Sequence, residues 1–301
     1  MKRMLFFVNP NAGHTEIRSN LLEVLQIFTK GGYEVTVHTT LAPQDLTRQI
    51  VERGGEYDII VCTGGDGTLN EAVSGIMQLE NRPPLGYIPG GTMNDVAFTL
   101  GIPKNVIAAA QNIVDGQVFT MDIGSFEGKW FTYVAAFGLF TDVSYDTPQE
   151  EKRILGRLAY LLNGVHALGE AKPVHVRMRC NGKTIEEDVI DGIVCSTMSV
   201  GGFRAPKKLG IRLNDGKFEV LLIRNFKNLA DFSAAAACLL RAEFPEPYFI
   251  TEKADRVEFE FDEDVPWTLD GEFGGMHKSV QIVNNQQALR ILVPQEPAQE
   301  E

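Results

Sequence analysis

The segment from Asp58 to Met77, DIIVCTGGDGTLNEAVSGIM, restricts the fold of this chain more than any other. It begins with an unbroken apolar run of strand length, which is typical of a parallel strand buried on both faces. Three glycines and one acid follow, and apolar residues from Leu69 to Ile76 then recur at helical spacing. A strand, a glycine turn and a helix in this order predict an α/β unit.

The glycine turn itself predicts an anion site. Each glycine of the run GGDG (64–67) costs backbone entropy on folding, which is explained if a ligand must approach bare backbone closely. We expect the helix to start through a capping box between Thr68 and Glu71, so that N–H groups and the positive end of the helix dipole converge. Asp66 would repel a phosphate unless a cation separated them, so Mg²⁺ with a nucleoside triphosphate is the predicted occupant. A glycine-rich turn without a ligand is the alternative.

Composition places the chain among globular proteins and argues against one class of partner. Its 301 residues suggest about two domains, and 44% hydrophobic with 23% charged residues can form a sizeable core. The net charge of −12 argues against nucleic acid as a partner. Four scattered cysteines without a C-x-x-C pair suggest core thiols in a reducing cytoplasm. No signal peptide or apolar run of membrane-spanning length is found, so we expect any membrane contact to be peripheral.

The first part of the chain alternates strands and helices. We expect strands at 3–8, 33–40, 58–63 and 85–89, and helices at about 16–30, 43–53 and 104–115. This alternation predicts a doubly wound parallel sheet within an amino-terminal domain, residues 1–122. A second glycine loop, GGTMND, also stands between a strand and a helix, so the two loops predict one shared triphosphate site. Asn94 and Asp95 are expected to cap the helix that follows, with orientation of Thr92 as the alternative role.

From about residue 118 the pattern changes to short alternating runs separated by Gly, Asn and Asp. Residues 123–301 are therefore predicted to form a mainly antiparallel β domain, a sandwich. Two helical stretches, 149–168 and 229–244, either cover the sheet or line a pocket for an apolar chain. One basic cluster interrupts the acidic sequence and consists of Arg204, Lys207, Lys208, Arg212 and Lys217. It would either meet anionic lipid head groups or remain a solvated loop.

Five motifs follow one another along the chain: NPNAG, GGDGTLNEAVSGI, GTMND, LNDGKFEV and LDGE. In this order they resemble the bacterial lipid kinases of the diacylglycerol kinase catalytic-domain family, over nearly the whole chain. The resemblance implies an α/β nucleotide-binding domain of the NAD-kinase/diacylglycerol-kinase type joined to a β-rich domain on the acceptor side. It also implies an ATP-dependent lipid kinase that uses Mg²⁺ to transfer the γ-phosphate to a diacylglycerol-like hydroxyl, in a cleft between the domains.

The family's functional residues map onto the matching motifs. The implied nucleotide contacts are Asn9, Thr40, Gly64, Gly65, Asp66, Gly67, Thr68, Asn70, Glu71, Gly91 and Thr92. The implied structural metal site has the Asp215 side chain with backbone carbonyls of Arg212 and Lys217. The implied catalytic residues are Glu272, Asp270 and Asp66.

Some roles stay open on the residues alone. Either Asp270 or Glu272 could be the base, with a slight preference for Glu272, and Asp-Gly is also a common hairpin turn. Asp122 is a candidate for the acidic network near Asp66, with a plain loop role as the alternative. Other open functions are a kinase of another alcohol, such as NAD or a sphingoid base, and a nucleotide- and lipid-binding regulator without turnover. We expect a lipid alcohol substrate, a role in phospholipid metabolism, a cytoplasmic protein attached peripherally to the membrane, and a possible homodimer.

Overall fold

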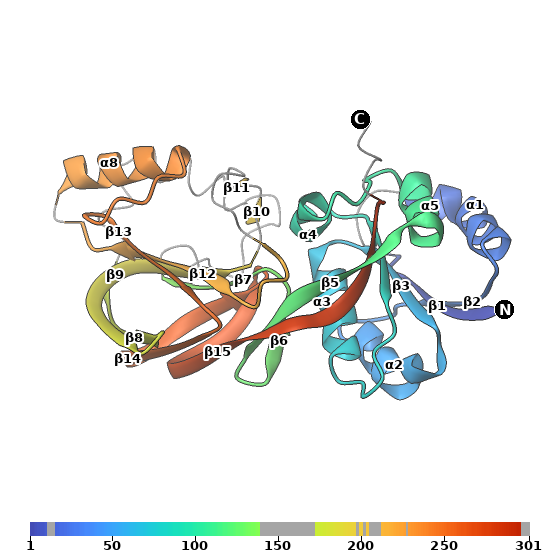
Figure 1. The fold of residues 1–301 in the computed structure, drawn as a ribbon, viewed down its shortest axis with the longest axis horizontal. Helices are drawn as coiled ribbons and strands as arrows, with labels where there is room; N and C mark the ends of the chain where they lie inside the picture. The colour runs from blue at the N-terminus through green and yellow to red at the C-terminus, as the bar shows by residue number, and fades with distance from the viewer. Residues whose placement is uncertain are drawn as a thin grey trace. The chain divides into compact units, whose positions relative to one another are not determined.

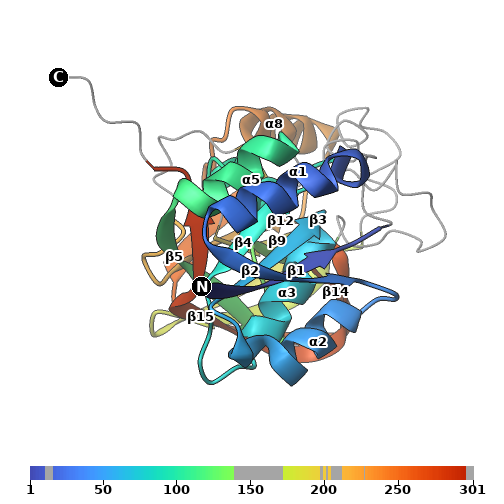
Figure 2. The same cartoon turned by 90° about the vertical axis from the view of Figure 1, so that its right-hand side faces the viewer.

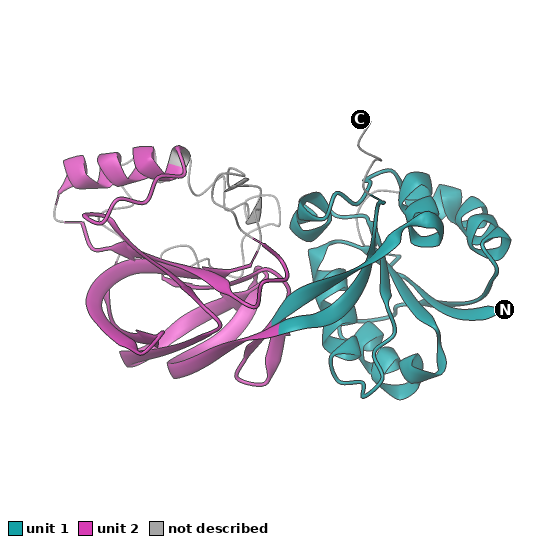
Figure 3. Cartoon of the chain, viewed as in Figure 1, with its two compact units in different colours: residues 1–123, 286–301 teal, residues 124–285 magenta. Residues whose placement is uncertain are grey.

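A computed structural model describes residues 1–10, 16–138, 172–196, 199–200, 203–204, 212–226 and 228–295. The chain forms two compact units (Figure 1, Figure 3). Unit 1 comprises residues 1–123 and 286–301, and unit 2 comprises residues 124–285. The division differs from the sequence-based one at its far end, because the predicted second domain ran to residue 301.

Unit 1 contains a parallel sheet in the order β4-β3-β1-β2. Its strands are β1 (Lys2–Val8), β2 (Tyr33–Thr39), β3 (Ile59–Gly64) and β4 (Leu85–Pro89). Every residue of β3 and of β4 is buried, as their unbroken apolar sequences predict, whereas the edge strand β2 is only half-buried.

Helices cover both faces of this sheet (Figure 2). On one face lie α1 (Glu16–Lys30) and α5 (Val106–Asp115), and on the other lie α2 (Asp45–Arg53) and α3 (Asp66–Ile76). Apolar side chains of α1 and α5 share one core with the strands, for example Phe28 against Phe6 with ring centroids 5.5 Å apart. The short elements η1 (Gly54–Glu56) and α4 (Asp95–Thr99) complete the unit. The predicted doubly wound α/β fold is confirmed.

Two strands carry the chain between the units: β5 (Gln117–Phe126) and β15 (Glu272–Val293). The last part of β15 pairs in parallel with β4, Ile291 opposite Leu85, and its Leu292 joins the core of unit 1. This pairing explains why residues from Gln286 onward belong to unit 1. Residues 280–285, one of the short alternating runs of the second domain, are the middle of this longer strand β15.

Unit 2 is mainly antiparallel, as predicted. Its other strands are β6 (Lys129–Phe131), β7 (Val134–Gly138), β8 (Val174–Cys180), β9 (Lys183–Cys195), β10 (Ser199–Val200), β11 (Phe203–Arg204), β12 (Phe218–Arg224), β13 (Phe249–Ala254) and β14 (Arg256–Leu269). The long strands β9 and β14 each pair with both β7 and β8, so the sheet curls around one core. Phe137, Phe259 and Trp267 pack at its centre, with ring centroids 4.8–5.6 Å apart, distances typical of an aromatic cluster.

Helix α8 (Leu229–Leu240) packs on unit 2 through Phe232 and Ala235, within the predicted helical stretch 229–244. Asn228 caps it by accepting a hydrogen bond from the Asp231 N–H group at 2.9 Å. The other predicted helix, 149–168, lies outside the described residues, as do Lys207 and Lys208.

All four cysteines are free thiols, and burial raises the pKa of Cys62 within β3. Among the helices that the structure describes, none is both long and apolar enough to cross a bilayer.

Candidate active site

The carboxyl edge of the parallel sheet gathers most of the predicted nucleotide contacts. The chain runs from β1 to its neighbour β2 on one side, and then returns past β1 to β3 on the other side. The strand order therefore reverses between β1 and β3, and α/β proteins bind ligands at the carboxyl edge of such a topological switch point. Asn9 follows β1, Thr40 follows β2, the GGDG turn follows β3 and Gly91 with Thr92 follows β4. The structure thus places these predicted residues at one edge of one sheet.

The two glycine loops contact each other backbone to backbone. The Gly90 N–H group donates to the Gly64 carbonyl at 2.7 Å. A Cβ atom added to Gly91 would lie 2.6 Å from the Gly65 Cα atom, closer than real Cβ atoms approach. Gly91 must therefore be a glycine for the loops to meet, whereas a Cβ atom at Gly65 would lie 3.3 Å from the Gly91 Cα atom, which is tight but not excluded. Gly67 differs from them, since a Cβ atom there would meet nothing within 4 Å.

Asn94 closes the second loop on itself. Its Oδ1 atom accepts from the Gly91 N–H group at 3.0 Å, and its Nδ2 atom donates to the Gly91 carbonyl at 2.7 Å. Its own backbone N–H group donates to Asp66 Oδ2 at 2.9 Å, which links the second loop to the first. The prediction that the Asn94 side chain caps the next helix is wrong. At φ 54° and ψ 53° the backbone is left-handed, and the side chain reaches back into its own loop.

Tyr87 is a site residue that the sequence reasoning missed. Its buried hydroxyl lies 2.9 Å from the Gly64 carbonyl, to which it donates, and 3.2 Å from Asn94 Oδ1. Burial raises the pKa of this phenol well above its usual value, and the charge of Asp66 raises it further. Tyr87 thus stays protonated, and its hydroxyl group contacts both loops, the first at the Gly64 carbonyl and the second at Asn94 Oδ1. The available signal was a single hydroxyl-bearing residue within an otherwise apolar buried strand.

The amino terminus of α3 is arranged differently from the predicted capping box. The helix begins at Asp66, and no side-chain hydrogen bond to its cap residue Gly65 is formed within the described residues. Thr68 therefore lies in the first turn, where its Oγ1 atom accepts from Asn9 Nδ2 at 3.1 Å. The first-turn N–H groups of such an uncapped helix are suited to an anion.

Glu71 serves a neighbouring helix instead of α3. Its carboxylate accepts from the backbone N–H groups of Gln44 and Leu46, at the start of α2. Burial raises the pKa of Glu71, and these two hydrogen bonds oppose that rise. The capping box failed as a prediction because a tertiary contact took the carboxylate. This geometry favours a structural role for Glu71 over the predicted nucleotide contact.

The remaining predicted contacts are less buried. Thr92 is exposed, and Thr40 is fixed at the end of β2 by its N–H group, which donates to the Val8 carbonyl at 3.0 Å. Asn70 is half-buried and lies within α3, with Ser74 Oγ 3.5 Å from its Oδ1 atom.

Asp122, the candidate for an acidic network near Asp66, is buried on β5, where it accepts a hydrogen bond from the Gln287 N–H group at 2.7 Å. That bond ties Asp122 to the returning strand β15.

The LDGE motif of unit 2 forms the turn between β14 and β15. Asp270 and Gly271, at φ 50° and 85°, are the two central residues of this hairpin turn, which agrees with the hairpin interpretation of an Asp-Gly pair. The Asp270 carboxylate accepts hydrogen bonds from the N–H and hydroxyl groups of Thr132 at 2.6 and 2.7 Å, and from the N–H groups of Tyr133 and Val134 at 3.0 and 3.1 Å. Burial raises its pKa, and these donors oppose the rise.

Glu272 differs from Asp270 in its surroundings. It is exposed and is the first residue of β15, directly after the turn. Both Asp270 oxygens are occupied in holding residues 132–134 against the turn, which favours a positioning role for Asp270. A carboxylate at the surface is better placed to reach a substrate, which favours Glu272 as a base.

Of the predicted metal ligands in LNDGKFEV, the Asp215 side chain pairs with a lysine ammonium group. Asp215 Oδ1 accepts from the Lys217 N–H group at 3.1 Å, and its Oδ2 atom pairs with Lys253 Nζ at 2.9 Å. Lys253 also pairs with Glu219 Oε1 at 2.9 Å. The buried Glu219 Oε2 atom has no hydrogen-bond partner in the part of the chain that the structure describes. In that same part, no group of three or more His, Cys, Asp or Glu side chains is placed to bind a metal.

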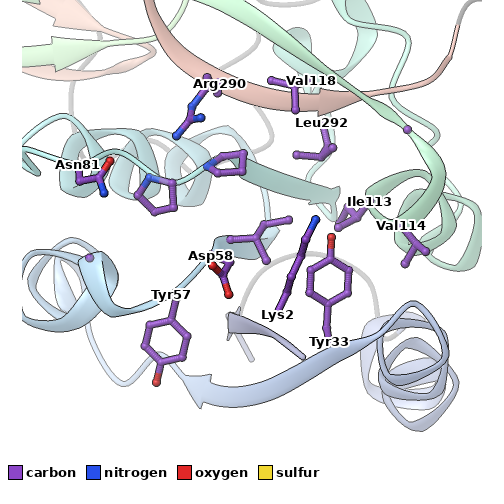
Figure 4. A pocket seen from close by; sticks show the side chains of 15 residues that line it. Lys2, Tyr33, Tyr57, Asp58, Asn81, Ile113, Val114, Val118, Arg290 and Leu292 are labelled. Atoms are coloured by element: carbon purple, nitrogen blue, oxygen red, sulfur yellow. The ribbon is translucent and has the colours of Figure 1, made fainter.

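A cavity of about 510 Å³ in unit 1 lies away from these residues (Figure 4). It is lined by Lys2, Tyr33 and Ile59 at the amino ends of β1, β2 and β3. Parallel strands place their amino ends at the edge opposite the glycine loops. This cavity is therefore not the predicted phosphate site.

Comparison with known proteins defines first the class and then the family. Residues 3–126 match the family described as the diacylglycerol kinase catalytic domain. A "Diacylglycerol kinase" of Bacillus subtilis (strain 168) is 38% identical over 305 residues, covering 100% of this chain and 99% of the relative. A protein of the same name from Staphylococcus aureus (strain MRSA252) is 33% identical and covers 100% and 95%. A crystal structure of a provisionally described diacylglycerol kinase from Bacillus anthracis str. Sterne superimposes with a TM-score of 0.84 at 26% identity, covering 97% of each chain.

The class is thus that of a kinase catalytic domain joined to a β-rich second part. The chain belongs to the bacterial diacylglycerol kinase family. The sequence-based expectation of a lipid kinase is confirmed.

Proposed function

We propose that this protein transfers the γ-phosphate of ATP to the free hydroxyl of diacylglycerol, with Mg²⁺ as the metal. The acceptor is proposed from the relatives, two of which are named diacylglycerol kinases. The donor site rests on one observation above all, the close packing of the two glycine loops, with Gly91 against Gly65. That packing presents a rigid surface of bare backbone, which phosphate oxygens can approach.

In this proposal the triphosphate lies at the carboxyl edge of the sheet. The first-turn N–H groups of α3 bind phosphate oxygens, and the helix dipole favours the negative charge. Asn9, Thr40, Thr68 and Thr92 supply side-chain hydrogen bonds around the nucleotide. Asp66 is the carboxylate that would hold Mg²⁺, and the metal would supply positive charge against the triphosphate.

The transfer step needs one bond to form and one to break. The acceptor oxygen attacks the γ-phosphorus while the bond from that phosphorus to the bridging oxygen of ADP breaks. Glu272 accepts the hydroxyl proton, and Asp270 positions the turn that carries it. We propose that the substrates meet in a cleft between the nucleotide-binding domain and the acceptor domain.

A second, structural Mg²⁺ at Asp215 fits the donor chemistry. One carboxylate with the carbonyls of Arg212 and Lys217 offers only oxygen ligands, which Mg²⁺ prefers. Asp215 and Glu219 carry two negative charges against the single charge of Lys253, and the orphaned Glu219 oxygen marks a place where positive charge is deficient. Mg²⁺ should therefore raise the thermal midpoint of the wild-type protein more than that of Asp215→Ala.

The proposed acceptor also requires contact with a membrane. We propose peripheral attachment at the cytoplasmic face, in which the basic cluster around Arg212 and Lys217 meets anionic head groups. Charge reversal at Lys207 and Lys208 should weaken binding to anionic vesicles. Unchanged binding would remove the cluster from the proposal.

The decisive experiment is transfer of radiolabelled γ-phosphate from ATP, with Mg²⁺, into a panel of lipid alcohols in detergent micelles. We expect label in phosphatidic acid when diacylglycerol is present. Glu272→Gln should lower that rate by about 10²- to 10⁴-fold without loss of folding. Label in a sphingoid base or in NAD would identify another alcohol as acceptor. Bound ATP without any transfer would refute the kinase mechanism and favour a regulator.

A further inference from the structure

The hairpin of β14 and β15 carries two large apolar side chains at its surface. Phe273 is 47% exposed and Met276 is 53% exposed. Both follow Glu272 closely in the sequence. Residues three apart on a regular strand lie on opposite faces of a sheet, so Phe273 and Met276 should not share a face.

A β-bulge brings them to the same face. Phe273 lies opposite Thr268, and Met276 lies opposite Pro266. Thr268 and Pro266 flank Trp267, whose side chain is fully buried in the core, so both point to the other side of the sheet. Their partners Phe273 and Met276 therefore also point outward. We call this outward group, Pro266, Thr268, Phe273 and Met276, the hairpin patch.

The bulge is built by specific residues. The pairing passes from Gly275 opposite Trp267 to Phe273 opposite Thr268, which leaves Gly274 as the additional residue. Gly275 has φ 121°, and a Cβ atom there would lie 2.6 Å from His277 Nε2. Lys129 Nζ donates to the Gly274 carbonyl at 2.7 Å and holds the bulge. The outward position of both apolar side chains is thus a fixed feature of the hairpin.

The charges near the hairpin patch match an uncharged partner. The ammonium group of Lys129, at the Gly274 carbonyl, and the exposed carboxylate of Glu272 contribute one charge of each sign to this hairpin. Farther along β14, the exposed residues Asp262, Glu263 and Asp264 would repel an anionic surface. Diacylglycerol has no charge and resides in the bilayer. Since no helix among the described residues can span a bilayer, a surface patch is the kind of feature that could reach this lipid.

We propose that the hairpin patch enters the apolar boundary of the bilayer and contacts the acyl chains of the glyceride substrate, next to the turn that carries Asp270 and Gly271. This inference rests on the proposed function, since it names how the acceptor is met. The contact is apolar, in contrast to the electrostatic contact proposed for the basic cluster. It should therefore persist at high salt, where exposed charges are screened.

The test measures sedimentation of the full chain with phosphatidylcholine vesicles that contain dioleoylglycerol, without ATP. We expect Phe273→Ser with Met276→Ser to lower the vesicle-bound partition coefficient at least about tenfold, because two apolar side chains no longer leave water. Phe273→Leu with Met276→Leu should restore binding. The matched control is Leu22→Ser with Val118→Ser, which removes two exposed apolar side chains from unit 1 and should bind like the wild type. Circular dichroism verifies folding.

Several outcomes would overturn the proposal. Wild-type binding by the double serine variant would do so, as would binding that disappears on raising NaCl from about 0.1 M to about 1 M. A change from dimer to monomer by light scattering, with vesicle binding intact, would assign the patch to contact between two copies. Vesicle binding is measured without turnover, so failure of the kinase assay would be distinguishable from failure of this inference.

Discussion

Gly67 provides the sharpest test of the phosphate site, because nothing within the folded chain requires a glycine there. It lies in the first turn of α3, outside the left-handed region, and an added Cβ atom would meet nothing within 4 Å. Alanine in a helix is more favourable than glycine by about 0.5–1 kcal/mol. If glycine serves the approach of a phosphate, Gly67→Ala should raise the free energy of unfolding by about that amount. It should also weaken ATP binding at least about tenfold, which is about 1.4 kcal/mol.

Two other glycines serve as controls with opposite expectations. Gly75 lies in the same helix, but an added Cβ atom would come 2.8 Å from Ile50 Cβ, so Gly75→Ala should destabilise the protein without a direct effect on ATP. Gly91→Ala would force the loops apart and should cost about 1–3 kcal/mol of stability together with ATP affinity. Only Gly67→Ala is expected to raise stability and lower affinity.

Urea unfolding followed by circular dichroism gives the stability, and calorimetric titration with MgATP gives the affinity. A Gly67→Ala protein that is more stable and binds ATP normally would show that no phosphate approaches this residue. A less stable protein would show that the open space around Gly67 does not exist in solution. Either result would refute the reasoning, and the first would also remove Gly67 from the proposed nucleotide contacts.

Three further predictions follow from contacts described above. Asp270→Asn turns an amide toward N–H donors and should destabilise the protein by about 2–4 kcal/mol in urea unfolding, whereas Glu272→Gln should leave the unfolding midpoint unchanged. Tyr87→Phe should lose about 1–2 kcal/mol and raise the KM for ATP, and an unchanged KM would separate Tyr87 from the loops. The Arg48 guanidinium, and then His38, lower the pKa of Asp45 to about 2. The ionised Asp45 carboxylate should therefore stabilise the protein above pH 4, and this contribution should be lost as the pH falls toward 2. The expected loss is about 1 kcal/mol, because Arg48 is largely exposed and solvent screens the pair. In acid-unfolding curves, the stability of Asp45→Asn should depend less on pH over this range.

The local signals of unit 1 could be read from the sequence. Buried parallel strands appear as continuous apolar runs, and the glycines between strand and helix mark both loops before any contact is known. The predicted capping box does not form, because the Glu71 carboxylate binds backbone N–H groups of a segment distant in the sequence instead of the start of its own helix. Thr68 and Glu71 have the right spacing, but α2 supplies N–H donors to Glu71 that no local pattern reveals.

Other features depend on contacts between segments far apart in the sequence. The hydrogen bond from Tyr87 to Gly64 joins two strands, and neither residue indicates the other. The length of β15 was hidden by the polar pair Gln286 and Gln287, which interrupts the apolar alternation. Gln287 adopts φ 51°, yet the strand continues past it into the core of unit 1.

The return of β15 has a consequence for the order of events during synthesis. Leu292 packs in the same core as Phe6 and Phe28, nearly the whole described chain away. A ribosome therefore releases all of unit 2 before the sheet of unit 1 can receive its last parallel strand. Domains generally fold as units, the amino-terminal one first, but unit 1 here must wait for residues made after its neighbour. A chain interrupted before residue 286 would contain every proposed nucleotide and catalytic residue and would still lack the strand that completes the nucleotide-binding fold.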